Sequence, residues 1–277
     1  MTEELSWLPL TREVSNSCEG RVVLSITSSV ATLTINRPNK LNAIDSGVLK
    51  GIRTALSGIE GSPSVGALIL RGTGRAFSAG GDLDEVSALV RDKTQFSTFL
   101  DFWHESLLLL QDSPVPSIAA VHGFAYAGGL ELTQACDFVV LGRSAVLGDQ
   151  HANFGLFPAG GSTQRLPRLI PPRVAMWMLM SGEAVDAQTA LQLGLVNRVV
   201  DDADVFDEAQ LMADTLARKS RSGNAAIKAA VRIGADRPLT DAIAAERCLA
   251  VDHMASDDAQ TGFDAFRSRT TPVFQPH

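Results

Sequence analysis

The tripeptide Ala-Gly-Gly occurs three times in this chain of 277 residues, at residues 79–81, 127–129 and 159–161. Each of the first two copies lies between an apolar, strand-like segment and a helix-like segment. A glycine pair lets the backbone turn with positive φ, and the start of a helix supplies N–H groups without an intrahelical partner. A glycine pair that merely ends a strand is the alternative for any single copy. Three copies in similar settings favour a site built from backbone N–H groups, in which two corners could bind one oxygen atom.

The composition excludes several classes of partner. The chain has 24 basic and 31 acidic residues, hence a net charge of −7, so no global basic surface for nucleic acid or anionic lipid is expected. No apolar stretch has the length of a membrane span, and the first residues do not resemble a secretory signal. The three cysteines are far apart and lack metal-ligand spacing, which predicts reduced thiols, a cytoplasmic location and no metal site.

Strand patterns alternate with helix patterns in the first two thirds of the chain. Residues 22–35 alternate apolar and small polar side chains around a short turn, which predicts a two-stranded hairpin. Residues 67–71 and 116–121 are apolar segments of the buried-strand type, and each leads into a glycine-rich loop and then a helical pattern. This order predicts an α/β core.

The chain divides into three predicted regions. Residues 1–20 are interpreted as a polar leader, residues 21–200 as the α/β core, and residues 201–277 as an α-helical region. Helices with apolar faces and no further sheet to cover often pack on a neighbouring subunit, so the last region is expected to mediate self-association.

An aromatic stripe lies in the helical pattern of residues 83–112. Large apolar side chains recur near one side of this segment, which is more typical of a core than of a cofactor site. The neighbouring His104 is expected at the surface or at an interface. The stripe consists of Phe96, Phe99, Phe102, Trp103 and Leu107.

Several short motifs follow one another at a characteristic order and spacing. They are INRP at residues 35–38 with LNA at 41–43, AFSAGGDL at 76–83, AAVHG at 119–123, GGLEL at 128–132 with CD at 136–137, and PAGGSTQRL at 158–166. Together they resemble the enoyl-CoA hydratase/isomerase (crotonase) superfamily. The resemblance covers residues 22–274, and residues 262–269 are similar to the last helix of that family.

The resemblance implies a fold and a ligand. It implies a crotonase-like spiral of ββα units with a C-terminal α-helical trimerisation region, assembled as a homotrimer or a dimer of trimers. The ligand would be an acyl-CoA thioester, with no cofactor beyond the coenzyme A moiety of the substrate. The N–H groups of Gly81 and Gly128 would form an oxyanion hole that stabilises a thioester enolate.

Two side chains are implied as acid/base groups. Glu131 matches the first of the two glutamates with which hydratases of this family hold and activate water. The second glutamate is replaced by His151, which can also transfer protons near neutral pH. Asp149 is close enough in sequence to orient His151. Family members that cleave a cyclic β-diketone resemble the chain in having this histidine, but their further loop aspartate corresponds to Gly160.

The resemblance also implies residues that bind coenzyme A. Arg37 and Lys40 lie where the family has basic residues near the CoA phosphates, and Arg269 matches a C-terminal basic residue that reaches the nucleotide. All three could equally be surface charges, and Arg37 is the strongest candidate for a structural role. The complete predicted set is Arg37, Lys40, Ala79, Asp82, Leu83, Phe266 and Arg269.

The leading functional prediction is an enoyl-CoA hydratase or dehydratase in which Glu131 is the principal base and His151 its partner. Double-bond isomerisation, which needs one base, and hydrolytic C–C cleavage of a β-keto thioester are the alternatives within the superfamily. An alternative of another class is an acyl-CoA-binding protein without turnover. A serine hydrolase is disfavoured because no serine accompanies a histidine and an acid in a recognisable arrangement.

Overall fold

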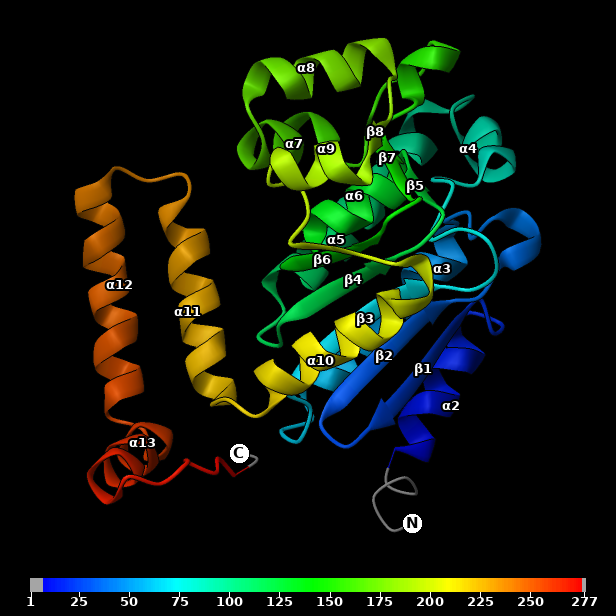
Figure 1. Cartoon of the computed structure of the whole chain (residues 1–277). Coiled ribbons are helices and arrows are strands. Elements are labelled where there is room, and N and C mark those ends of the chain that lie inside the picture. Colours follow the sequence, from blue (N-terminus) through cyan, green and yellow to red (C-terminus); the bar gives the residue numbers. More distant parts are fainter. Residues whose placement is uncertain (1–6, 276–277) are drawn as a thin grey trace.

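A six-stranded sheet forms the centre of the computed structural model, which describes residues 7–275 (Figure 1). Its strand order is β1-β2-β3-β4-β6-β9; only β1 and β2 are antiparallel, and the later neighbours pair in parallel. The predicted hairpin is confirmed, with Val22 opposite Ile35 and Thr27 opposite Val30. The strands are β1 (Val22–Thr27), β2 (Val30–Ile35), β3 (Ala67–Gly72), β4 (Ser117–Val121), β6 (Phe138–Gly142) and β9 (Arg198–Val200).

A second, three-stranded sheet comprises β5 (Phe124–Tyr126), β7 (Val146–Gly148) and β8 (Val185–Asp186). The chain passes from β4 through β5 to helix α6 (Gly128–Ala135), and then from β6 through β7 towards α7 (Ser162–Leu169). Each repeat therefore places one strand in each sheet before a helix follows. These repeats are the ββα units of the predicted spiral.

Helices cover both faces of the large sheet. On one face, α2 (Leu8–Ser17), α3 (Ser46–Glu60) and α5 (Lys93–Asp112) enclose the main core, whose largest fully buried side chains include Phe77 and Ile52. On the other face, α10 (Val205–Ala217) packs Ala209 and Ala213 against the strands. Because α10 packs on the sheet, it is part of the core, and the separate C-terminal part of the chain begins after α10.

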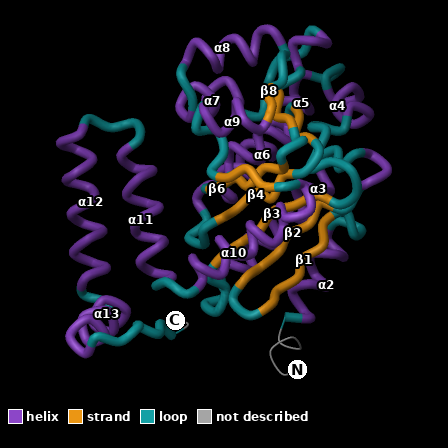
Figure 2. The backbone as a smooth tube through the Cα atoms, in the orientation of Figure 1, coloured by secondary structure: helices purple, strands orange, loops and turns teal. Residues whose placement is uncertain are grey.

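The C-terminal helices form a separate arm. The helices α11 (Arg221–Gly234) and α12 (Leu239–Met254) are antiparallel and extend beside the core, and α13 (Asp257–Ser268) lies at the end opposite the turn between them (Figures 1 and 2). Apolar side chains such as Ile227 and Val231 are 65% and 70% exposed on this arm. Within residues 7–275, no helix is both long and apolar enough to cross a membrane.

The remaining short elements connect these parts. They are the helices α4 (Leu83–Leu89), α8 (Pro172–Ser181) and α9 (Ala187–Gln192), and the 3-10 helices η1 (Pro38–Lys40), η2 (His151–Phe154) and η3 (Asp202–Asp204).

The N-terminal segment is more ordered than a polar leader. Residues 1–6 of that predicted region lie outside the described residues, but α2 begins with Pro9 in its first turn and packs on α3. Val14 and Cys18 are completely or almost completely buried. Leu10 and Val14 are four residues apart and therefore share one face of the helix, which is the signal that links this segment to the core. Farther along, the helical pattern of residues 83–112 is divided into α4 and α5 by the turn around Asp92, which caps α5.

Candidate active site

The first glycine corner follows β3 and is held by a buried asparagine. Asn42 is 0% exposed, and its Nδ2 atom donates to the carbonyl oxygens of Thr73 and Ala76 at 2.7 and 2.8 Å. Ser78 donates through its hydroxyl to Asn42 O at 2.9 Å and accepts from Gly80 N at 3.2 Å. Gly80 itself has φ 107°, a conformation that favours glycine. These contacts fix the peptide that carries the Gly81 N–H group.

The second glycine corner lies between β5 and α6. Ala127 has φ 47° and ψ −118°, an uncommon conformation for alanine, and it turns the chain so that Gly128 becomes the first residue of α6. A Cβ built on Gly80 would lie 3.1 Å from Gly128 N, and one built on Gly128 would lie 3.2 Å from Gly81 N. The two corners are therefore in contact.

Two backbone donors without a partner lie where the corners meet. Within residues 7–275, neither Gly81 N–H nor Gly128 N–H has a hydrogen-bond partner, and Gly128 has none within its helix because it is the first residue. Unpaired N–H groups at adjacent corners can both donate to one ligand oxygen. This arrangement has the donor set of an oxyanion hole.

Glu131 lies in the first turn of α6, next to these donors in sequence. It is 1% exposed, and its Oε1 atom accepts from Ser162 N at 3.4 Å at the start of α7. Burial raises the pKa of Glu131, and the positive charge of His151 lowers it only in part. A carboxylate with a raised pKa and few hydrogen bonds is a stronger base than one on the surface.

His151 is held by the buried carboxylate of Asp149. The Nδ1 atom of His151 lies 2.7 Å from Asp149 Oδ1, and Asp149 is 0% exposed. Burial alone would lower the pKa of His151, but the hydrogen bond and charge of Asp149 and the charge of Glu131 together raise it. The bond at Nδ1 leaves Nε2 as the ring atom that can exchange a proton with a ligand. The charges of Glu131 and His151 each act on the pKa of the other group.

The third Ala-Gly-Gly copy lies against the same site. A Cβ on Gly160 would approach both Glu131 Oε2 and Trp103 Nε1 more closely than 3.0 Å, so no larger residue fits without movement. His104 Nε2 lies 2.6 Å from Ala159 O, which fastens this loop to α5. His104 is thus a partly buried contact between α5 and the loop.

Trp103 is the site residue that the sequence interpretation missed. It is 4% exposed and packs in the core with Phe99, as the aromatic stripe predicts. Its six-membered ring also lies beside both glycine corners: a Cβ on Gly128 would be 2.6 Å from Cζ2, and one on Gly81 would be 3.9 Å from Cη2. Helical periodicity identifies a buried side chain but not which neighbours its far end meets, so no local signal marks this contact.

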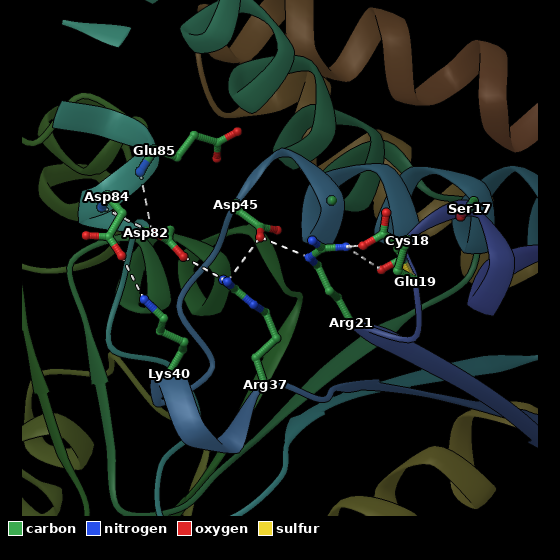
Figure 3. A pocket seen from close by; sticks show the side chains of 11 residues that line it. Ser17, Cys18, Glu19, Arg21, Arg37, Lys40, Asp45, Asp82, Asp84 and Glu85 are labelled. Atoms are coloured by element: carbon green, nitrogen blue, oxygen red, sulfur yellow. Dashed lines mark hydrogen bonds and ion pairs between the residues drawn. The ribbon is translucent and has the colours of Figure 1, made fainter. Parts of the chain in front are cut away.

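The predicted CoA-binding residues divide into two groups. Five lie around the first corner, where Arg37 forms ion pairs with Asp82 and Asp45 at 2.8 and 3.2 Å, and Lys40 pairs with Asp84 at 2.7 Å (Figure 3). The five are Arg37, Lys40, Ala79, Asp82 and Leu83.

Arg37 and Asp82 interact with each other and with neighbouring protein groups beside the first corner. The Asp82 side chain caps α4 through a hydrogen bond from Asp84 N at 3.1 Å. Burial alone would raise the pKa of Asp82, but Arg37 and the bonds at the helix start lower it. These two residues stabilise the loop that carries the first corner. The side chain of Leu83, in contrast, is 65% exposed at the start of α4, and phosphate binding by Arg37 and Lys40 stays a prediction.

The other predicted CoA contacts lie on α13. Phe266 is 84% exposed and Arg269 is exposed just after that helix. In Figure 1, α13 lies on the opposite side of the molecule from α4, so one chain does not bring these two residues to the first corner. Their role as CoA contacts also stays a prediction.

The site thus combines two adjacent glycine corners, whose N–H groups at Gly81 and Gly128 have no partner within residues 7–275, with a buried glutamate one helical turn farther along. The sequence profile of the enoyl-CoA hydratase/isomerase family matches residues 25–277. The chain belongs to this family.

Individual relatives agree with this assignment. A probable enoyl-CoA hydratase of Mycobacterium tuberculosis is 34% identical over 88% of the chain and 94% of its own length. The 2,3-dehydroadipyl-CoA hydratase of Escherichia coli is 34% identical over 92% and 98%, respectively. The crystal structure of an enoyl-CoA hydratase from Mycobacterium smegmatis superimposes with a TM-score of 0.87 at 32% identity, covering 91% of this chain and 98% of its own.

Proposed function

We propose that the protein is an enzyme that adds water to a 2-enoyl-CoA thioester, or removes it in the reverse direction. One observation carries the proposal: the buried Glu131 follows the second glycine corner, next to the unpaired N–H groups of Gly81 and Gly128 that could bind a thioester oxygen. The charge of His151, which Asp149 holds, also acts on the Glu131 carboxylate. Relatives that carry hydratase names support the same reaction class.

The thioester carbonyl would accept hydrogen bonds from Gly81 N–H and Gly128 N–H. As water attacks Cβ, the π electrons of the C=C bond move towards the thioester and create an enolate oxygen. Donors that are already in place stabilise this charge more than they stabilise the carbonyl, and losing one such donor typically costs about 3 kcal/mol of barrier. Glu131 would remove a proton from the water while the water oxygen forms the new bond to Cβ.

His151 would complete the reaction by proton transfer to Cα. Its raised pKa keeps a larger fraction protonated near neutral pH, and Asp149 stabilises the imidazolium form. After the step, Glu131 carries the proton from water and His151 is neutral, so one proton must move from the carboxyl to the imidazole before the next turnover. Thus a carboxylate and a histidine would perform the work of two carboxylates.

Other properties of the proposal extend beyond the site. We propose that the arm formed by α11, α12 and α13 assembles a homotrimer or a dimer of trimers, because its apolar side chains are exposed in the single chain. The three cysteines form no disulfide, which supports a reducing, cytoplasmic location. The coenzyme A of the substrate is the proposed ligand, without a further cofactor.

The experiment is incubation of the purified protein with crotonyl-CoA in heavy-oxygen water, followed by mass spectrometry of the thioester. Label in the acyl chain that disappears with Glu131→Gln is the expected result. Conversion to another double-bond isomer without label would favour isomerisation. In a parallel incubation with a β-keto thioester, label with loss of a carbon–carbon bond would favour hydrolysis. Tight binding without any turnover, unchanged by Glu131→Gln, would leave only an acyl-CoA-binding protein.

A further inference from the structure

The indole N–H of Trp103 is an unsatisfied donor in the interior. The atom Nε1 is inaccessible to solvent and has no hydrogen-bond partner within residues 7–275. Buried tryptophan N–H groups usually find an acceptor, because an unpaired one is unfavourable. The mechanism proposed above leaves this donor unused.

The position of the indole indicates where its acceptor belongs. Its six-membered ring borders the corners of Gly81 and Gly128. Its Nε1 atom and Glu131 Oε2 both lie within 3.0 Å of the position that a Cβ on Gly160 would occupy. The indole thus extends from the donors for the thioester oxygen to the carboxylate that handles the water. The acyl carbons after the carbonyl would lie along this path.

The indole is held rigidly in this position. Phe99 packs on it with a distance of 5.8 Å between ring centroids, and the adjacent His104 fastens the Gly160 loop to the same helix at 2.6 Å. A donor fixed by packing binds a ligand with little loss of side-chain entropy.

We propose that Trp103 Nε1–H donates to the oxygen atom on Cβ of the acyl group. That oxygen is the attacking water in hydration and the hydroxyl of the 3-hydroxyacyl thioester in dehydration; the inference therefore rests on the proposed function. An attacking water uses one lone pair for the new bond and gives one proton to Glu131, so its second lone pair is free to accept from Trp103.

The donor also defines a class of preferred ligand. A thioester with an oxygen at Cβ satisfies the N–H group, whereas a saturated acyl chain of the same length leaves it buried and unpaired. A site with a buried donor discriminates strongly against ligands that lack the matching acceptor. Trp103 is accordingly a specificity-determining residue for 3-oxygenated acyl-CoA thioesters.

The test compares acetoacetyl-CoA, whose Cβ oxygen does not leave as water, with butyryl-CoA, which lacks that oxygen. Dissociation constants are measured by calorimetry for the wild-type protein and for Trp103→Phe, which keeps an aromatic ring and removes the N–H group. The matched control is Phe102→Leu on the same helix, whose ring packs under Arg53 at 4.9 Å. We expect Trp103→Phe to weaken acetoacetyl-CoA binding about tenfold and butyryl-CoA binding less than twofold. The control is expected to change neither value by more than twofold.

A second measurement follows the indole signals of the wild-type protein and does not depend on the folding of Trp103→Phe. The chain contains three tryptophans, so a spectrum of ¹⁵N-labelled indole groups contains three N–H signals, of which Trp7 and Trp177 are assigned by replacement with phenylalanine. The Trp103 signal is expected to move downfield with acetoacetyl-CoA and not with butyryl-CoA.

Three results would overturn the inference. An equal loss of affinity for both thioesters in Trp103→Phe would mean that the ring only packs, and no loss for either would mean that the N–H group does not reach the ligand. An indole signal that responds identically to both thioesters would have the same consequence. In contrast, acetoacetyl-CoA binding that depends on Trp103, in a protein that shows no Glu131-dependent hydration, would refute the proposed function. The contact between Trp103 Nε1–H and the oxygen on Cβ would then still hold.

Discussion

Replacement of Gly160 by alanine tests whether the absence of a side chain at this position is needed for the placement of Glu131 and Trp103. A methyl group there would approach Glu131 Oε2 and Trp103 Nε1 closer than 3.0 Å, whereas ordinary contacts begin near 3.4 Å. Both side chains are buried and both contacts are too short, so both side chains, or the loop itself, must move by roughly 1 Å. Crowding of this kind costs about 1–3 kcal/mol of stability, and a displacement of about 1 Å at a reacting group can reduce the rate about 100-fold, equivalent to about 2.7 kcal/mol of barrier.

The assay measures crotonyl-CoA hydration and urea-induced unfolding for wild type, Gly160→Ala and a control, Gly262→Ala. Gly262 lies within α13, and a Cβ there would meet nothing within 4 Å, so the control is expected to gain up to about 1 kcal/mol from helix propensity. The expected result is a kcat reduced about 100-fold in Gly160→Ala and unchanged in the control. If Gly160→Ala retained more than a third of wild-type kcat, the idea that Glu131 and Trp103 need this space would be wrong.

Three further variants test the acid/base pair and the loop. Glu131→Gln should reduce kcat about 10²–10⁴-fold. The pKa of Glu131 in the folded protein is raised above its ordinary value of 4.5, so the wild-type protein loses stability as pH rises from 4.5 through that raised pKa. The stability of Glu131→Gln relative to wild type should therefore increase between pH 5 and pH 8, as measured by urea unfolding, and a difference that does not change with pH would contradict this. Asp149→Asn removes the charge that raises the pKa of His151, so the alkaline limb of kcat/KM should move to lower pH; an unmoved limb would separate Asp149 from catalysis. Asn42→Ala removes two buried hydrogen bonds to loop carbonyls and should destabilise the fold by about 3 kcal/mol in the same unfolding assay, whereas a loss below about 1 kcal/mol would show that the loop holds without it.

The glycine corners were predictable because their signal is local. A glycine pair between a strand pattern and a helix pattern places Gly81 and Gly128 at turns without knowledge of the tertiary structure, whereas the role of Glu131, in the first turn of α6, is implied only by the family resemblance. The two antiparallel strands and the parallel sheet follow from the same periodicity. The repeated pattern favours a meeting of two corners, but the distances between them depend on the pairing of strands that are distant in sequence.

The missed features depend on contacts between distant segments. Trp103 has the periodicity of a core residue and is one, but its indole N–H meets a loop almost sixty residues away along the chain, near Gly160. Arg37 is the strongest candidate for a structural role among the three basic residues, but its partners Asp82 and Asp45 can be identified only in the folded chain. Burial and partner choice are properties of the assembled fold, so a list of residue types and spacings identifies the catalytic candidates better than it identifies what surrounds them.

Ala127 and Gly80 lie on either side of the contact between the two corners. The methyl group of Ala127 would be only 2.8 Å from a Cβ at position 80, so the space admits one methyl group and not two. A side chain gained at position 80 would meet this methyl group and, in addition, the carbonyl oxygen of Tyr126 at 3.0 Å. A library that varies both residues together should recover glycine at position 80 among active clones, with alanine or glycine at position 127, because the φ of 107° disfavours alanine at position 80 even when the neighbouring methyl group is removed.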